Sequence, residues 1–262
     1  MDYQAFRLEV SDGVAHVALA KPAQGNPIDG QFCAEFSELT IALDQRKDVR
    51  AVLLTADGPA FSVGGDISAF VQDLDNLPTQ IKRWTAGLHM GISRMQRMNS
   101  PWVAAVHAVC AGGSLALVAG CDYVLCGPQA RFVAGYPGIG FSCDAGASVT
   151  LSRRMGMARG RRFLLANESL DANGAIAAGL VDELADGETL GERSEAAARR
   201  FAAGPTLAYG EIRRLFLSAG NQPLETQLEF EAQALARIAA SADAREGLTA
   251  FRDKRKPKFT AN

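Results

Sequence analysis

The sequence predicts an α/β fold that gives way to helices in its second part. Apolar runs of strand length alternate with amphipathic segments of helix length as far as residue 134, a pattern typical of parallel strands joined by right-handed crossovers. Beyond Asp144 the apolar residues follow a helical spacing almost throughout. A chain of 262 residues therefore fits one large domain with an appendage better than two equal domains.

Residue periodicity and turn residues place the individual elements. Strands are expected at 14–19, 51–55, 103–109, 123–126 and 131–134, with a late edge strand at 180–184. Helices are expected at 29–44, 79–98, 114–119, 145–155, 158–166, 172–178, 188–203, 205–218 and 223–240. Asp29 is the expected N-cap of the first helix, and Gly204-Pro205 is the expected linker. The polar segment 72–78 is expected to be mobile.

Composition and charge exclude several classes of function. The net charge is −2 and the pI is about 6.0, so there is no overall basic surface to recruit nucleic acid. The three histidines are dispersed, and no Cys/His cluster has the spacing of a metal site. Five cysteines without C-x-x-C spacing are typical of a reducing compartment, and the N-terminus has the pattern of neither a signal nor a transit peptide. We therefore expect a cytoplasmic protein.

The segment from Trp102 to Asp122 is the most informative part of the chain, because a glycine pair separates two apolar runs there. Residues 102–121 carry no charge and are about as long as a bilayer span. The glycine pair and His107 interrupt that run, and no second such run exists, which favours a buried strand followed by a buried helix.

Glycines occur at strand-to-helix turns for conformational reasons alone, but such a turn also leaves backbone N–H groups unpaired. Those groups can bind a developing oxyanion. The pair Gly64-Gly65 follows the strand at 51–55 in the same way as Gly112-Gly113 follows its own strand. Two such turns can direct two amides to one oxygen.

Several motifs follow one another across nearly the whole chain. They are Asn26-Pro27-Ile28, the segment 61–67 (FSVGGDI), the segment 111–114 (AGGS) with Cys121-Asp122, the segment 140–146 (GFSCDAG), the segment 178–181 (AGLV) and the segment 250–257 (AFRDKRKP). In this order and spacing the chain resembles the enoyl-CoA hydratase/isomerase, or crotonase, superfamily. The resemblance implies a crotonase (ClpP-like) spiral of ββα units over residues 1–200. It also implies a C-terminal helical region at 201–262 that assembles trimers or hexamers.

The resemblance further implies an acyl-CoA thioester as the substrate. Coenzyme A is part of that substrate, so no separate cofactor is expected, and neither nucleic acid nor a membrane is expected as a partner. The oxyanion hole corresponds to the backbone amides of Gly65 and Gly113. The residues expected at the CoA moiety are Ala60, Phe61, Asp66 and Ile67 and, from a neighbouring subunit, Phe251 and Lys254.

The expected carboxylate decides between the reactions of this family. Its hydratases use two glutamates, and the corresponding positions here are Ala116 and Tyr136, neither of which can act as a carboxylate acid or base. Asp144 lies in the segment where many β,γ to α,β enoyl-CoA isomerases carry their aspartate. One carboxylate suffices for isomerisation, because it can take the C2 proton and return it to C4. Asp144 is also suited to be the N-cap of the helix at 145–155, and the two roles are not mutually exclusive.

Other functions remain as alternatives. His89 corresponds to a base in 4-chlorobenzoyl-CoA dehalogenases, whose nucleophile is an aspartate at the Asp144 position and which carry a tryptophan where this chain has Tyr136. We expect His89 and Tyr136 at the substrate site. A hydratase that works without the two glutamates and a non-catalytic acyl-CoA-binding protein are the remaining alternatives. By analogy of fold, the segment 72–92 is expected to shape the acyl pocket.

The remaining candidate groups are expected to be structural. His107 lies in an apolar strand and is expected to be a hydrogen-bonded core histidine, whereas His16 alternates with apolar neighbours and is expected to face solvent. Cys143 has no basic neighbour in the sequence that would activate it as a nucleophile.

Overall fold

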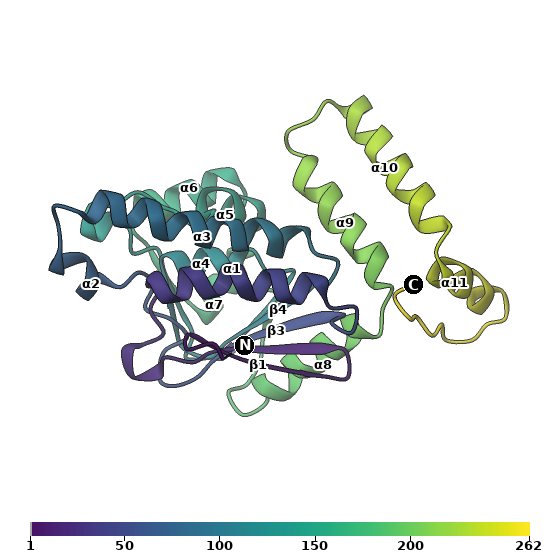
Figure 1. Ribbon diagram of the computed structural model, residues 1–262, viewed down its shortest axis with the longest axis horizontal. Helices are drawn as coiled ribbons and strands as arrows, with labels where there is room; N and C mark the ends of the chain where they lie inside the picture. Colours follow the sequence, from purple (N-terminus) through teal and green to yellow (C-terminus); the bar gives the residue numbers. More distant parts are fainter. Residues whose placement is uncertain (1) are drawn as a thin grey trace.

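In the computed structural model, which describes residues 2–262, the chain winds through two β-sheets (Figure 1). The larger sheet contains, in spatial order, β1 (Phe6–Ser11), β2 (Val14–Leu19), β3 (Ala51–Ala56), β4 (Trp102–Val106), β6 (Tyr123–Cys126) and β9 (Glu183–Leu184). The smaller sheet contains β5 (Val109–Ala111), β7 (Arg131–Val133) and β8 (Ser169–Asp171). The strands from β2 to β9 in the larger sheet are parallel, as the alternation of strands and helices predicts.

Successive turns of the chain add one strand to each sheet, which makes the fold a spiral. β4 leads directly into β5 and β6 leads into β7, so neighbours in one sheet continue as neighbours in the other. The turn after β3 joins the smaller sheet through a bridge between Ser62 and Cys110. The prediction of one strand at 103–109 was wrong, because the chain changes sheets at His107. The Nε2 atom of His107 lies 2.9 Å from the Gly58 carbonyl oxygen at this corner, so the histidine is hydrogen-bonded but only half-buried.

The observed helices lie close to the residue ranges predicted from the sequence. They are α1 (Gly30–Gln45), α2 (Ile67–Gln72), α3 (Leu77–Arg97), α4 (Gly113–Ala119), α5 (Ala147–Met155), α6 (Met157–Leu165), α7 (Ala172–Ala177), α8 (Leu190–Ala202), α9 (Thr206–Ser218), α10 (Leu224–Ala239) and α11 (Ala242–Arg252). Two 3-10 turns, η1 (Pro22–Gln24) and η2 (Pro137–Ile139), complete the set. The nine predicted helices agree with these bounds to within two residues at each end. Asp29 caps α1 by accepting a hydrogen bond of 2.7 Å from the Phe32 amide.

Four elements were not predicted, namely β1, α2, β8 and α11. The sequence did contain a signal for β1, because Asp-Gly is a strong hairpin signal. Asp12 and Gly13 form the turn between β1 and β2, and both have positive φ. The segment 102–121 is divided among β4, β5 and α4 and does not form one span. Within residues 2–262, no helix combines the length and the hydrophobicity needed to traverse a bilayer.

Both faces of the larger sheet are covered, which explains why its strands are continuous apolar runs. Val52 and Leu54 of β3 belong to the main core, which α1 and α3 close from one side. The alternate residues Ala51 and Leu53 pack with Ala198 of α8 on the other side. Figure 1 shows α1 and α3 on one side of the strands and α8 on the opposite side.

The expectation that His16 faces solvent was wrong. Its side chain points to the face of the sheet that α8 covers, and Nε2 lies 2.8 Å from Glu195 Oε2 of that helix. The alternating pattern of β2 did not reveal this, because the helix that supplies the partner is almost 180 residues away in the sequence.

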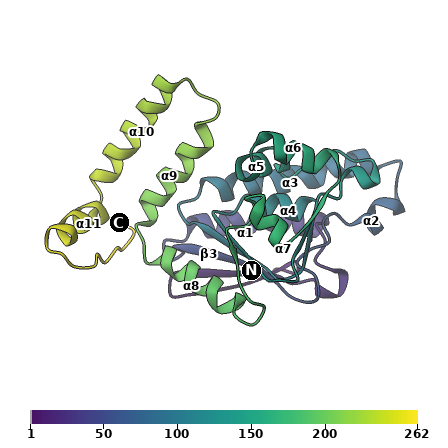
Figure 2. The same cartoon turned by 180° about the vertical axis from the view of Figure 1, so that it is seen from behind.

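The C-terminal helices α9, α10 and α11 extend away from the sheets as an arm (Figures 1 and 2). The arm begins after Gly204-Pro205, and α9 packs against α3 while α10 packs back on α9. The last residues fold against α11, where the buried carboxylate of Asp243 accepts hydrogen bonds from the amides of Thr260 (2.7 Å) and Ala261 (2.9 Å). The domain division at residue 200 stays a prediction.

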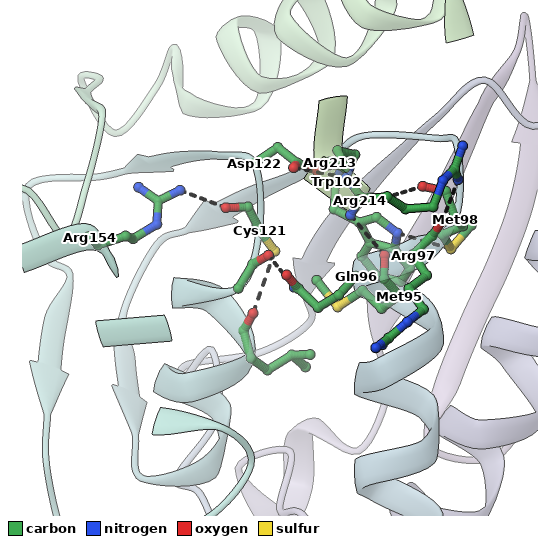
Figure 3. A network of polar contacts seen from close by, with 12 residues as sticks. Met95, Gln96, Arg97, Met98, Trp102, Cys121, Asp122, Arg154, Arg213 and Arg214 are labelled. Atoms are coloured by element: carbon green, nitrogen blue, oxygen red, sulfur yellow. Dashed lines mark hydrogen bonds and ion pairs between the residues drawn. The ribbon is translucent and has the colours of Figure 1, made fainter. Parts of the chain in front are cut away.

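A buried arginine joins the arm to the sheets. Arg213 of α9 donates to Asp122 Oδ1 at 2.9 Å and to the carbonyl oxygens of Met95 and Met98 at the end of α3. The other carboxylate oxygen of Asp122 accepts the amide of Trp102, the first residue of β4, at 2.7 Å. In Figure 3, Arg213 lies beside Asp122 and Met98, while Arg154 reaches the neighbouring carbonyl of Cys121.

Replacing Arg213 by methionine is expected to lower the free energy of unfolding by ~2–4 kcal/mol, because buried carbonyls and a carboxylate lose their donor. Urea unfolding at matched protein concentration measures the change. The exposed pair of Arg46 with Asp48 supplies the control, and Arg46→Met is expected to cost less than ~1 kcal/mol. Equal losses for the two variants would contradict the role assigned to Arg213.

Candidate active site

A cavity of about 450 Å³ opens between the glycine turns, α3 and the loop after η2. Its walls are largely apolar, and Asp144 is the single charged side chain among the lining residues. The lining consists of Ile28, Cys33, Val63, Gly64, Gly65, Ile67, Phe70, Ile81, Trp84, Thr85, Leu88, Ala111, Gly112, Gly113, Gly135, Tyr136, Ile139, Gly140, Phe141, Ser142 and Asp144. The cavity is therefore suited to an apolar group that presents one reactive centre to a carboxylate.

The first glycine turn is held by the buried Asn26, which in the sequence is recognisable only as part of a motif. The Asn26 side chain donates to the carbonyl oxygens of Asp57 (2.9 Å), Ala60 (3.1 Å) and Phe61 (3.2 Å). The Ser62 hydroxyl donates to the Asn26 carbonyl oxygen at 2.7 Å. These bonds fix the chain that leads into Gly64-Gly65. Asn26 also has a positive φ of 54°, a backbone angle that cannot be read from the sequence.

The two glycine turns touch each other. A Cβ built on Gly64 would lie 2.7 Å from the carbonyl oxygen of Ala111, and Gly64 has a φ of +85°, so only glycine fits there. The Ile28 amide donates to the Gly64 carbonyl oxygen at 2.7 Å and the Ala111 amide donates to Ser62 at 3.1 Å. Within residues 2–262, neither the Gly65 amide nor the Gly113 amide donates a hydrogen bond to a backbone or side-chain acceptor. Both N–H groups remain available to a ligand.

Asp144 lies next to the second turn. Its Oδ1 atom is 3.5 Å from the position that a Cβ on Gly113 would occupy, and it accepts a hydrogen bond of 2.9 Å from the Tyr136 hydroxyl. Of the two roles considered for Asp144, the helix cap is not formed, because α5 begins at Ala147 with Gly146 as its N-cap and no side-chain cap. Ala145 and Gly146 both have positive φ, and this turn directs the carboxylate to the cavity instead of the helix amides.

Tyr136 holds the carboxylate from the buried side of the cavity. Burial, followed by the charge of Asp144, raises the pKa of its phenol far above the ordinary value, so the hydroxyl is a neutral donor at every working pH. Ala116 is buried in α4 and supplies no polar group. Asp144 Oδ2 accepts no hydrogen bond from any group in residues 2–262, which leaves one carboxylate oxygen free.

Comparison with known proteins identifies the family. Residues 9–262 match the model of the enoyl-CoA hydratase/isomerase family. The chain belongs to this family. It is 33% identical over 99% of both chains to a Rhodobacter capsulatus protein named "probable enoyl-CoA hydratase". It is 31% identical over 96% of both chains to the 1,2-epoxyphenylacetyl-CoA isomerase of Escherichia coli.

Solved structures confirm the crotonase fold of this family member. An enoyl-CoA hydratase from Polaromonas sp. JS666 superposes with a TM-score of 0.90 at 26% identity and covers 97% of this chain and 99% of its own. The chain is therefore an acyl-CoA enzyme of the enoyl-CoA hydratase/isomerase family. Within residues 2–262 no group of three or more His, Cys, Asp or Glu side chains is arranged to hold a metal ion.

The structure separates His89 from the cavity lining. The exposed ring lies behind the Asp144 turn, where Nε2 accepts a hydrogen bond of 3.3 Å from the Ala145 amide. His89 is thus placed to support the turn, and it is not among the residues that line the cavity.

The other residues expected at the CoA moiety fall into two groups. In this family member Ile67 lines the cavity, Phe61 is fully buried, and Asp66 caps α2 by accepting the Ala69 amide at 2.9 Å. Phe251 and Lys254 lie at the exposed end of α11, on the arm and outside the cavity lining of the same chain. Figure 2 shows that end of the arm on the opposite side of the molecule from α2.

The cysteines of this family member differ in exposure. Burial raises the pKa of the thiols of Cys33 and Cys110 to about 12 and that of Cys126 to about 11, and it raises the pKa of Cys121 even further. These groups are protonated near neutral pH, so Cys33 presents a neutral thiol to the cavity and not a thiolate nucleophile. Cys143 is the half-buried cysteine.

A maleimide reagent at pH 8 is expected to label one cysteine per native chain, namely Cys143, because the other four are buried and their raised pKa values keep them as thiols. Peptide mass spectrometry identifies the labelled site, and Cys143→Ser should abolish the labelling. Rapid modification of Cys33 in the native protein would show that the cavity thiol is ionised, contrary to this assignment.

Proposed function

We propose that this protein is an enoyl-CoA isomerase that shifts a β,γ double bond to the α,β position, with Asp144 as the base and proton carrier. The observation that carries the proposal is the single carboxylate in the cavity lining, placed beside Gly113 and held by Tyr136. A relative that is 31% identical is named as an isomerase of an acyl-CoA, which supports this direction.

The amides of Gly65 and Gly113 would bind the thioester oxygen. Negative charge builds on that oxygen when the C2 proton leaves, and a fixed N–H donor typically contributes ~3 kcal/mol to the transition state of such a step. The close contact of the two turns and the absence of competing acceptors in residues 2–262 support this role.

Asp144 then transfers the proton from C2 to C4 on one face of the substrate. Oδ2 of Asp144 removes the C2 proton, and the electron pair of that C–H bond forms a conjugated dienolate with the charge on the thioester oxygen. The protonated carboxyl returns the proton to C4, which restores the carbonyl and leaves the double bond between C2 and C3. The Tyr136 hydroxyl, bound to Oδ1, orients the carboxylate throughout these steps. No water is activated and no second acid is needed.

Hydration is disfavoured by the same geometry. A hydratase must activate water and protonate C2, two tasks that its paired glutamates divide, and the cavity lining offers one carboxylate. A dehalogenase of the alternative type needs an aspartate that attacks the ring and a base that activates water to hydrolyse the resulting aspartyl ester. His89 lies outside the cavity lining, and its Nε2 already accepts the Ala145 amide.

The proposed function includes a homotrimer or a hexamer. Large apolar side chains are exposed along the whole arm, at Ile212, Phe216, Leu224, Leu228, Phe230, Leu235, Leu248 and Phe251. Apolar surface of this extent is typical of an interface between subunits. We also propose that Phe251 and Lys254 reach the CoA moiety bound by a neighbouring subunit, and that the protein works in the cytoplasm.

Asp144→Asn is expected to lower the isomerisation rate about 10²–10⁴-fold, because the amide cannot accept the C2 proton. The amide keeps the shape of the carboxylate and can still accept the Tyr136 hydroxyl, so binding of a saturated acyl-CoA should be nearly unchanged. Conversion of 3-hexenoyl-CoA and exchange of the C2 proton in deuterated water measure the effect.

Asp186→Asn, an exposed change before α8 and outside the cavity lining, is the matched control and should behave like the unaltered protein. Retained turnover in Asp144→Asn would contradict the proposal. Formation of 3-hydroxyacyl-CoA from crotonyl-CoA by the unaltered protein would favour a hydratase, and tight binding without C2 exchange would favour a non-catalytic acyl-CoA-binding protein.

Light scattering on a sizing column is expected to give three or six times the chain mass of 27.8 kDa. The pair of changes Leu235→Glu and Leu248→Glu should reduce that mass, because both leucines are exposed on the arm. Leu74→Glu, which is also exposed but lies between α2 and α3, should leave the mass unaltered. A single-chain mass for the unaltered protein would overturn the assembly.

A further inference from the structure

Three aromatic rings from separate parts of the chain meet in the wall of the cavity. They are Phe70 of α2, Trp84 of α3 and Phe141 of the loop after η2. The ring centroids of Phe70 and Trp84 are 5.7 Å apart with an interplanar angle of 36°, and those of Phe70 and Phe141 are 5.8 Å apart at 29°. Each ring is half-buried and lines the cavity. The three side chains, here called the aromatic wall, form one continuous surface.

The aromatic wall begins next to the carbonyl-binding amides. A Cβ built on Gly65 would lie 3.2 Å from Cε2 and 3.3 Å from Cζ of Phe70. If the thioester oxygen binds the Gly65 amide, as the proposed function requires, the first carbons of the acyl group leave the carbonyl beside Phe70. The acyl atoms beyond these first carbons then lie against Trp84 or Phe141.

The cavity has no partner for a second charge on the acyl group. Apart from Asp144, every lining side chain is apolar or neutral. The hydroxyl of Thr85 already donates to the Ile81 carbonyl oxygen at 2.7 Å. A carboxylate at the far end of the acyl group would be desolvated without a cation, and Asp144 would repel it.

The size of the cavity suits a ring. An apolar cavity of roughly 150 Å³ is enough to bind benzene, and this cavity measures about 450 Å³. A six-membered ring and the atoms around the thioester therefore fit together. A flat ring also gains directional contacts with aromatic neighbours that an alkyl chain does not make.

We propose that the acyl group is an uncharged ring-acetyl group, in which C2 of the thioester carries a flattened, partly unsaturated six-membered ring whose own double bond is the β,γ bond. The attachment at C2 rests on the proposed function, because an aromatic ring bonded directly to the carbonyl would leave no C2 proton for Asp144 to remove. The aromatic wall stacks on the ring, and the amides of Gly65 and Gly113 hold the carbonyl at its edge.

Calorimetry with four CoA thioesters of equal acyl carbon number tests this proposal on the unaltered protein. The probes are phenylacetyl-CoA, cyclohexylacetyl-CoA, octanoyl-CoA and suberyl-CoA. We expect phenylacetyl-CoA to bind about 10-fold more tightly than octanoyl-CoA, since each stacked pair contributes a factor of roughly 2 to 10. Cyclohexylacetyl-CoA should lie between them, and suberyl-CoA should bind most weakly.

Two variants locate the preference in the aromatic wall. Trp84→Leu and Phe141→Leu should each weaken phenylacetyl-CoA binding by a factor of roughly 2 to 10 while changing octanoyl-CoA binding much less. Ile81→Leu, a change of shape without loss of an aromatic ring in the same wall of the cavity, should affect both probes alike. The two aromatic variants are independent, so a folding failure of one leaves the other as the test.

Octanoyl-CoA binding as tightly as phenylacetyl-CoA would overturn the proposal, and so would equal losses for both probes in both leucine variants. Because these measurements record binding without turnover, they are independent of the assignment of Asp144. A ring preference that persists while Asp144→Asn retains activity would leave the substrate class standing and reject the isomerase mechanism. Loss of activity in Asp144→Asn together with equally tight binding of phenylacetyl-CoA and octanoyl-CoA would support the isomerase mechanism and reject the ring-acetyl substrate.

Discussion

The contact between the two glycine turns is the constraint on which the rest of the site depends. The backbone at Gly64 approaches the Ala111 carbonyl so closely that a Cβ there would lie 2.7 Å from the oxygen. Only a residue without a side chain permits this approach, and it brings the free amides of Gly65 and Gly113 to one end of the cavity. Asn26, with its three backbone contacts, maintains the approach from the buried side.

The spiral supplies the carboxylate to this end of the cavity. The turns that contain β4 and β6 each add a strand to both sheets, and the chain that leaves the smaller sheet after β7 passes through η2 to the Asp144 turn. Two left-handed residues there prevent the carboxylate from capping α5. Tyr136 then holds one carboxylate oxygen and leaves the other free. Within residues 2–262 the cavity lining therefore combines one carboxylate with the unpaired amides of Gly65 and Gly113, and the proposed isomerisation rests on this arrangement.

The arm and the body are coupled through buried polar groups. Arg213 connects α9 to the end of α3 and, through Asp122, to the first residue of β4. Since the same α3 carries Trp84 in the cavity wall, the helix that the arm contacts also shapes the cavity. Assembly through the arm would therefore support the cavity as well as supply residues to a neighbour.

Much of the fold and part of the site follow from the sequence alone. Local signals determine the helix bounds, as with the Asp29 cap, and the glycine pairs mark the turns where amides stay unpaired. The sequence alone pointed to Asp144 as the candidate carboxylate. It could not determine whether that side chain caps the helix or faces the cavity, because the direction depends on backbone angles set by packing. The break after Val106, the ion pair of His16 with Glu195, and the direction of His89 likewise require partners distant in sequence.

The aromatic wall is the clearest case of what only tertiary structure decides. Phe70, Trp84 and Phe141 come from two helices and a loop, and nothing in their spacing distinguishes them from ordinary core residues. Local sequence determines where a helix starts, since the interacting groups lie within one turn of each other. A cavity is bounded by side chains whose distances are set by the whole fold, so the choice of substrate belongs to the tertiary structure.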